Sequence, residues 1–270
     1  MKEKHSAYSP SHKEFLKKIK KETAIVFSLR FSILFSLILI WELLARLNVI
    51  DSFISSYPTE IAITIVKLFK DNQLLYHLLV TLYETILGFI IAVGLGYVIA
   101  LALWWSERLR RVLEPYIVVL NSLPKIALGP IIIVWFGSSS KSIVFMAVLI
   151  GIIVAIIMML NGFLATDKNK ILLLKSMGAN KFQILQKLVI PSSLPTFISM
   201  LKTSVGMAWI GSIMGEYLVS KAGLGYLIVY GGQVFKLDLV MASTIILCLL
   251  ATLMYVLVAL LEKKIIKHKY

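Results

Sequence analysis

Six long apolar segments fill most of this 270-residue chain, and short polar stretches rich in Lys and Arg separate them. Each segment is about 20 residues or longer, the length that an α-helix needs to cross the hydrocarbon core of a bilayer. The segments are continuous runs of Leu, Ile and Val without ten-residue alternation, so they predict helices and exclude a β-barrel. The expected spans are residues 25–46, 82–105, 112–136, 142–164, 191–216 and 238–261.

The composition supports a membrane protein. The chain is 59% hydrophobic with a mean hydropathy of +0.89, which is too apolar for a soluble domain of this length. We therefore expect an all-α, polytopic bundle of six transmembrane helices, with residues 1–24 as a basic cytoplasmic tail and 25–270 as one transmembrane domain. The run from Thr23 to Leu44 is long for a cleaved signal peptide, and no small-residue cleavage site follows it. We expect it to be a permanent span.

Basic residues gather on one side of the expected spans. The net charge is +14; eight Lys and Arg lie up to Arg30, three follow the second span, five follow the fourth and four lie in the C-terminal tail. The opposite side holds six. Because cytoplasmic loops carry an excess of Lys and Arg, both termini are predicted to face the cytoplasm. Because the charges follow the arrangement of the spans, a nucleic-acid partner is not expected.

The loop after the fourth span is predicted to form two short helices joined by a glycine. Asp167 is a suitable N-cap for a helix from Lys168 to Met177. Gly178 can adopt the left-handed conformation that ends a helix. Asn180 can cap a second helix, with Gln183 three residues later in a capping-box arrangement. The expected product is an elbow that Pro191 and Pro195 separate from the fifth span.

Apolar side chains recur at a spacing of three along both helices of this elbow. Ile171, Leu174 and Met177 form one stripe, and Phe182, Leu185 and Leu188 form another. Apolar stripes on a cytoplasmic loop need to be covered. Two interpretations stay open: the stripes pack against the chain's own spans, or they dock into a groove of a partner protein.

The elbow resembles the EAA loop of the membrane subunits of bacterial ATP-binding-cassette (ABC) importers. That loop has Glu-Ala-Ala, three residues, Gly, nine residues and a closing Ile-x-Leu-Pro. Gly178 matches the glycine, and Leu188, Ile190 and Pro191 match the end of the pattern. Leu172, Leu173 and Leu174 replace Glu-Ala-Ala, so the resemblance does not supply a carboxylate contact. The stretches Ser122–Gly137 and Leu201–Ile228 are similar to the nitrate, sulfonate and taurine branch of these importers.

The resemblance implies a multi-pass permease subunit in the bacterial cytoplasmic membrane. It further implies a second permease subunit forming a homodimer, two ATPase subunits docked on the coupling loop 165–190, and an extracytoplasmic solute-binding protein. ATP and Mg²⁺ would belong to the ATPase, since this chain has no G-x-x-x-x-G-K-[ST] loop and no cofactor of its own is expected. The implied ATPase contacts are Leu174, Lys175, Ser176, Met177, Gly178, Ala179 and Asn180.

Two lysines fall within expected spans. Lys125 follows Pro124, where the third helix should break, and Lys202 lies roughly 16 Å into the fifth span. A lysine at mid-depth costs about 2.5–3.5 kcal/mol on insertion scales, so each needs a partner. Either each pairs with a glutamate such as Glu84 or bonds free carbonyls near Pro124, or one or both line a pathway with Trp209 and attract an anion.

The second interpretation, together with the resemblance, predicts a small anionic substrate of the sulfonate, taurine or nitrate type, with Lys202 preferred over Lys125 as its contact. Two alternatives are kept. The same importer architecture serves vitamin precursors of the pyrimidine or riboflavin type, and an ion-coupled secondary transporter would need no ATPase.

Several further features of the sequence each give a separate expectation. The segment Tyr57–Asp71 is predicted to be an amphipathic helix that either lies on the outer membrane surface or packs against the bundle. Glu42, Glu84 and Glu216 are expected to be interfacial or paired. The last outer loop is expected to be turn-rich or re-entrant, because it contains Gly223, Gly225, Gly231 and Gly232.

Gly94 and Gly96, inside the second span, are expected to permit close helix packing, and Cys248, inside the sixth, is expected to be a core residue. His5, His12, His77 and His268 are scattered, so no metal site is expected.

Overall fold

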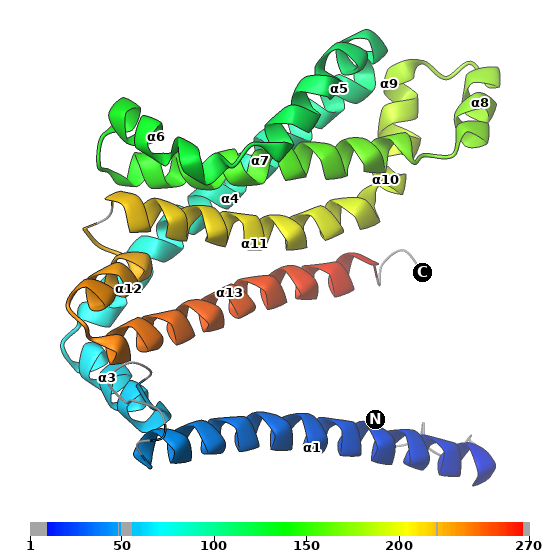
Figure 1. Ribbon diagram of the computed structural model, residues 1–270. Coiled ribbons are helices and arrows are strands. Elements are labelled where there is room, and N and C mark those ends of the chain that lie inside the picture. Colours follow the sequence, from blue (N-terminus) through cyan, green and yellow to red (C-terminus); the bar gives the residue numbers. More distant parts are fainter. Residues whose placement is uncertain (1–9, 48, 50–55, 220, 267–270) are drawn as a thin grey trace. The chain divides into compact units, whose positions relative to one another are not determined.

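The computed structural model describes residues 10–47, 49, 56–219 and 221–266, and every regular element in this part of the chain is helical (Figure 1). Contacts divide the chain into two units, Met1–Ile63 and Thr64–Tyr270. His5, His268 and the first nine residues of the expected tail lie outside the described residues, so the predictions for them are not addressed by the structure.

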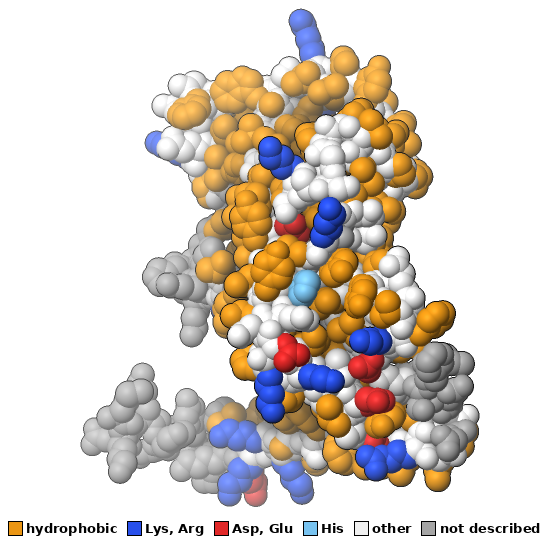
Figure 2. Space-filling model, turned by 90° about the vertical axis from the view of Figure 1, so that its left-hand side faces the viewer, with side chains coloured by type: hydrophobic (Ala, Val, Ile, Leu, Met, Phe, Trp, Pro, Cys, Tyr) orange, Lys and Arg blue, Asp and Glu red, His pale blue; other side chains and the backbone are white. Residues whose placement is uncertain are grey.

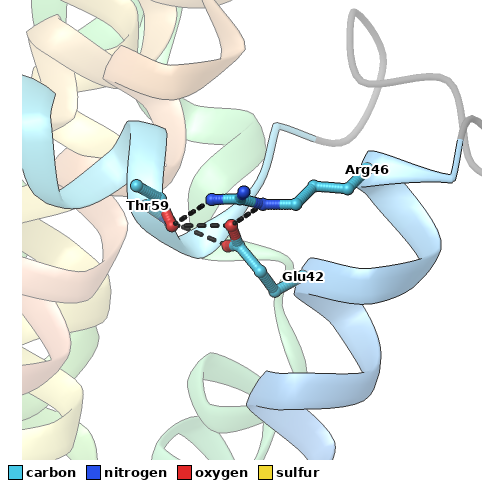
Figure 3. A network of polar contacts seen from close by, with 3 residues as sticks. All are labelled: Glu42, Arg46 and Thr59. Atoms are coloured by element: carbon cyan, nitrogen blue, oxygen red, sulfur yellow. Dashed lines mark hydrogen bonds and ion pairs between the residues drawn. The ribbon is translucent and has the colours of Figure 1, made fainter.

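The first unit contains α1 (Pro10–Arg46) and the start of α3 (Pro58–Lys70). Residues 10–24, expected as a tail, are therefore helical. The Glu42 carboxylate accepts hydrogen bonds from Thr59 N at 3.0 Å, Thr59 Oγ1 at 2.6 Å and Arg46 Nε at 2.7 Å, as Figure 3 shows. It thus satisfies an orphan N–H in the first turn of α3. The expectation that Glu42 is paired is confirmed.

The second unit holds the remaining elements. They are α4 (Gln73–Trp105), α5 (Glu107–Ser122), η1 (Lys125–Leu128), α6 (Gly129–Phe136), α7 (Ser140–Leu164), α8 (Lys168–Ser176), α9 (Lys181–Ile184), η2 (Leu185–Val189), α10 (Ile190–Ser192), α11 (Leu194–Val219), α12 (Leu224–Gln233) and α13 (Leu237–Ile266). In Figure 1, α8 and α9 lie at one end of this unit, and α12 lies at the other. The second half of α3 is joined to α13 by a hydrogen bond of 2.7 Å from Thr64 Oγ1 to Asp238 Oδ2.

Small residues let α4, α7 and α11 pack with their backbones close together. A Cβ added at Gly88 would lie 2.5 Å from Ala147 Cβ, and one at Gly96 would lie 2.6 Å from Ala155 Cβ. At Gly211 it would lie 2.4 Å from the Cα atom of Ala147. Lipid tails are as apolar as the side chains, so close van der Waals contact has to hold membrane helices together. These three helices therefore form the core of the unit.

The third expected span, residues 112–136, is broken. The helix pair on either side of the break is bent by 86°. Pro124 has no N–H and disfavours helical conformation in the preceding residue, and Leu123 has φ −66° and ψ 136°. Five helices in the described chain are long and apolar enough to cross a membrane, or six if this bent pair is one span.

Other expectations need correction. α4 begins at Gln73, well before residue 82, and the glycine-rich outer loop contains the ten-residue helix α12. Cys248 is exposed instead of lying in the core. Gly96 packs as expected, but a Cβ at Gly94 would meet nothing within 4 Å. Helix ends and helix faces depend on the neighbouring helices, which hydropathy alone does not reveal.

Candidate functional site

The elbow between α7 and α11 has the local structure that its capping residues predict. Asp167 Oδ1 accepts a hydrogen bond from Asn169 N at 2.8 Å and so caps α8. Gly178 has φ +86°. Asn180 and Gln183 form a reciprocal capping box: Gln183 N donates to Asn180 Oδ1 at 2.9 Å, and Asn180 N donates to Gln183 Oε1 at 2.8 Å.

The second arm of the elbow is less regular than expected. α9 passes into the π-helical segment η2, which is followed by the short α10 containing Pro191. A π-turn holds more residues per turn than an α-helix, and such turns are frequent at functional sites. This irregular segment joins the elbow to α11.

The apolar stripes of the elbow are divided between the core and the surface. Ile171 and Leu174 pack, in part, against a cluster containing Phe163, Ile184 and Leu185. Two of the implied ATPase contacts, Leu174 and Ala179, thus pack against this cluster. This is the arrangement expected if the stripes cover the chain's own spans.

The exposed apolar side chains of the elbow come only in part from the stripes. Four form what we call the elbow surface: Leu172 (66% exposed), Leu173 (59%), Met177 (74%) and Phe182 (60%). Only Met177 and Phe182 belong to the stripes identified in the sequence. The sequence did not identify Leu172 and Leu173 as surface residues, because their exposure depends on how α8 lies against the core.

Lys181 fastens the elbow to the end of α4. Its Nζ lies 5.7 Å from the ring centroid of Trp104 and 5.2 Å from that of Trp105, and it donates a hydrogen bond to the Trp105 carbonyl. A helix leaves its last carbonyls without intrahelical partners, and an ammonium group satisfies one of them. The charge also benefits from the faces of both indoles. These contacts tie the elbow to the corner between α4 and α5.

The three expected pathway residues have different surroundings. Lys202 forms an ion pair with Glu262 of α13, so its partner is not Glu84. Trp209 is 3% exposed and packs with Val205 and Val258.

Lys125 lies at the break after α5, and its Nζ donates to Asn121 O at 3.3 Å. Among the described residues it forms no ion pair. Within the described ranges, no three His, Cys, Asp or Glu side chains converge as a metal site would require.

Comparison with known proteins places this geometry among transport proteins. Residues 92–267 match the model of the family described as "Binding-protein-dependent transport system inner membrane component". A Bacillus subtilis protein named as an aliphatic sulfonates transport permease, SsuC, is 29% identical over 86% of this chain and 84% of its own length. The formylaminopyrimidine transport permease protein ThiX of Halalkalibacterium halodurans is 33% identical over 70% of this chain and 75% of its own length.

A solved structure has the same fold. It is a bacterial alginate ABC transporter in complex with an alginate pentasaccharide-bound periplasmic protein, and one of its chains superposes with a TM-score of 0.64. The match covers 92% of this chain and 97% of that chain at 15% identity.

Proposed function

This chain belongs to the family of binding-protein-dependent transport system inner membrane components, and we propose that it carries a small anionic solute of the sulfonate, taurine or nitrate type. It is a multi-pass permease subunit of an ABC importer in the bacterial cytoplasmic membrane. An ion-coupled secondary transporter, one of the alternatives from the sequence, does not belong to this family.

We infer that two copies of this chain form the pathway and that two ATPase subunits dock on their elbows, with ATP and Mg²⁺ held by the ATPases. The elbow surface carries this inference. The elbow exposes four large apolar side chains, and a groove in a partner protein would bury them. An extracytoplasmic binding protein would deliver the solute at the opposite end.

The inference of an anionic solute rests on the uncompensated charge of Lys125. Glu262 already neutralises Lys202, whereas Lys125 contacts a backbone carbonyl. A cation in a medium of low dielectric constant attracts an anion far more strongly than it does in water. Lys125 is therefore the first candidate for contact with the solute, with Lys202 and Trp209 as further candidates on α11.

The test is solute uptake by proteoliposomes that contain this chain, its ATPase and its binding protein. Lys125→Met is expected to lower the uptake of taurine or an alkanesulfonate at least tenfold, while Lys125→Arg retains most of it. Lys141→Met, which removes an exposed lysine at the start of α7, is the matched control. Full uptake by Lys125→Met would contradict the assignment of Lys125.

A vitamin precursor is the second candidate, because ThiX is 33% identical to this chain. The two candidates differ in charge. A neutral pyrimidine or flavin should be transported equally by the wild type and by Lys125→Met. Measuring which of these compounds the partner binding protein retains would separate the two candidates independently of the permease.

A further inference from the structure

The outer end of the second unit, opposite the elbow, contains a polar cluster that docking of the ATPase on the elbow does not explain. Figure 2 shows this end of the molecule, where charged side chains lie between hydrophobic ones. Three successive N–H groups at the start of α12 donate to side chains of other helices: Gly223 N to His77 Nδ1 at 3.0 Å, Leu224 N to Thr81 Oγ1 at 2.7 Å, and Gly225 N to Glu216 Oε2 at 2.5 Å. Side chains of α4 and α11 thus hold the start of α12.

The backbone at the start of α12 is shaped around the Glu216 carboxylate. Gly223 has φ +108°, and a Cβ there would lie 2.4 Å from Glu216 Cδ. A Cβ at Gly225 would lie 2.7 Å from Glu216 Oε2. The N–H groups at the start of α12 and the positive end of its helix dipole favour an anion at this point. Glu216 is therefore suited to the ionised form.

A second carboxyl group is buried beside the first. Glu84 and Glu216 are each 1% exposed, and the Glu84 carboxyl group lies within hydrogen-bonding reach of Glu216 and Ser140. Neither oxygen of Glu84 accepts a regular hydrogen bond from the described residues, and Oε1 of Glu216 also lacks a donor. Two carboxylates have no hydrogen to share, so their contact becomes a hydrogen bond only when one of them is protonated.

No basic side chain compensates this pair. Among the described residues, no Lys, Arg or His forms an ion pair with either carboxylate. His77 uses Nδ1 as an acceptor, which is the neutral form of that nitrogen.

Among the described residues, the other titratable groups nearby include Tyr76 on α4, Tyr217 on α11, Tyr226 on α12, Lys221 in the loop between α11 and α12, and Lys141 on α7. Both lysines are exposed. Two negative charges in this buried seam would repel each other strongly, and a single proton removes the repulsion.

We propose that Glu84 is a neutral carboxylic acid that donates its proton to Oε1 of Glu216. The chain would then have a resident proton-binding site where α4, α7 and α11 meet. The proton gives Oε1 of Glu216 the donor that it lacks, while Oε2 stays bonded to Gly225 N. Loss of the proton would place a second charge beside Glu216 and weaken its hold on α12. The site thus fastens α12 in a proton-dependent way, and it depends on neither the solute nor the partner proteins.

Infrared spectroscopy of the purified full chain in detergent tests this proposal. The wild type should show the C=O stretching band of one protonated carboxyl group at neutral pH, where exposed carboxyl groups are ionised. Glu84→Gln should lose this band, and the control Glu60→Gln, at a partly exposed position in α3, should keep it. Absence of the band from the wild type at neutral pH would overturn the proposal, whether or not any variant folds.

The dependence of stability on pH gives a second measurement. The folded chain holds this proton while an unfolded glutamate releases it near its ordinary pKa, so the folded state binds more protons and loses stability as pH rises. The wild-type melting temperature should therefore fall as the pH rises above the ordinary pKa of glutamate, and it should level off once the folded pair also loses its proton. Glu84→Gln keeps an N–H donor toward Glu216 and should lack that fall. Parallel profiles of the two proteins over this pH range would contradict the proposal. His77 is present in both proteins, so its protonation affects both profiles alike and the difference between them reports the Glu84 proton.

Discussion

Replacement of Gly178 by Val should disable the elbow without removing the protein from the membrane. Gly178 has φ +86°, and a Cβ at this position would meet nothing within 4 Å, so any penalty comes from the backbone and not from a clash. A β-branched residue in the left-handed region costs about 1–3 kcal/mol. If this penalty acts on the conformation that binds the ATPase, the affinity should fall by roughly 5- to 150-fold.

The assay compares ATPase binding to purified wild type, Gly178→Val and Gly178→Asn. Asn tolerates the left-handed conformation much better than Val, and the open space accommodates its side chain. Gly178→Asn should therefore stay close to the wild type, while Gly178→Val binds weakly and supports little ATP-driven uptake at a normal membrane level. Equal affinities for the Val and Asn variants would refute the reasoning, because the positive φ would then not matter for docking.

Two further predictions concern topology and the partly exposed ion pair between Lys202 and Glu262. In a Cys248→Ala background, an impermeant thiol reagent added outside sealed right-side-out vesicles should label a cysteine at Ser138 but not one at Asn180; labelling at Asn180 would contradict cytoplasmic termini. Lys202→Met should lower the melting temperature because it leaves Glu262 unpaired, and Lys202→Met combined with Glu262→Gln should recover it. If the double variant also recovers uptake, Lys202 is structural; if uptake stays low while stability returns, Lys202 contacts the solute.

Local signals predicted the class of fold and the elbow correctly. Hydropathy identifies a membrane helix because the bilayer imposes the same requirement on every segment that crosses it. The caps at Asp167 and Asn180 and the turn at Gly178 depend on residues within one helical turn, so each could be derived from neighbouring positions. The break at Pro124 was predictable for the same reason, although its angle of 86° was not.

Contacts between distant residues were decided by packing. Lys181 meets Trp105, which is 76 positions earlier, and Lys202 meets Glu262, which is 60 positions later. Nothing in the sequence near either lysine indicates its partner. The sequence suggested Glu84 as a partner for a lysine, but in the fold it lies beside another carboxyl group.

The exposed face of the elbow was also decided by the tertiary structure. A spacing of three identifies apolar stripes, but it does not say which side of a short helix faces the core. α8 turns Ile171 and Leu174 toward the cluster around Phe163, and this leaves Leu172 and Leu173 exposed. Capping and hydropathy act within a few residues, whereas the faces of helices and the partners of buried charges follow from how α4, α7 and α11 approach one another.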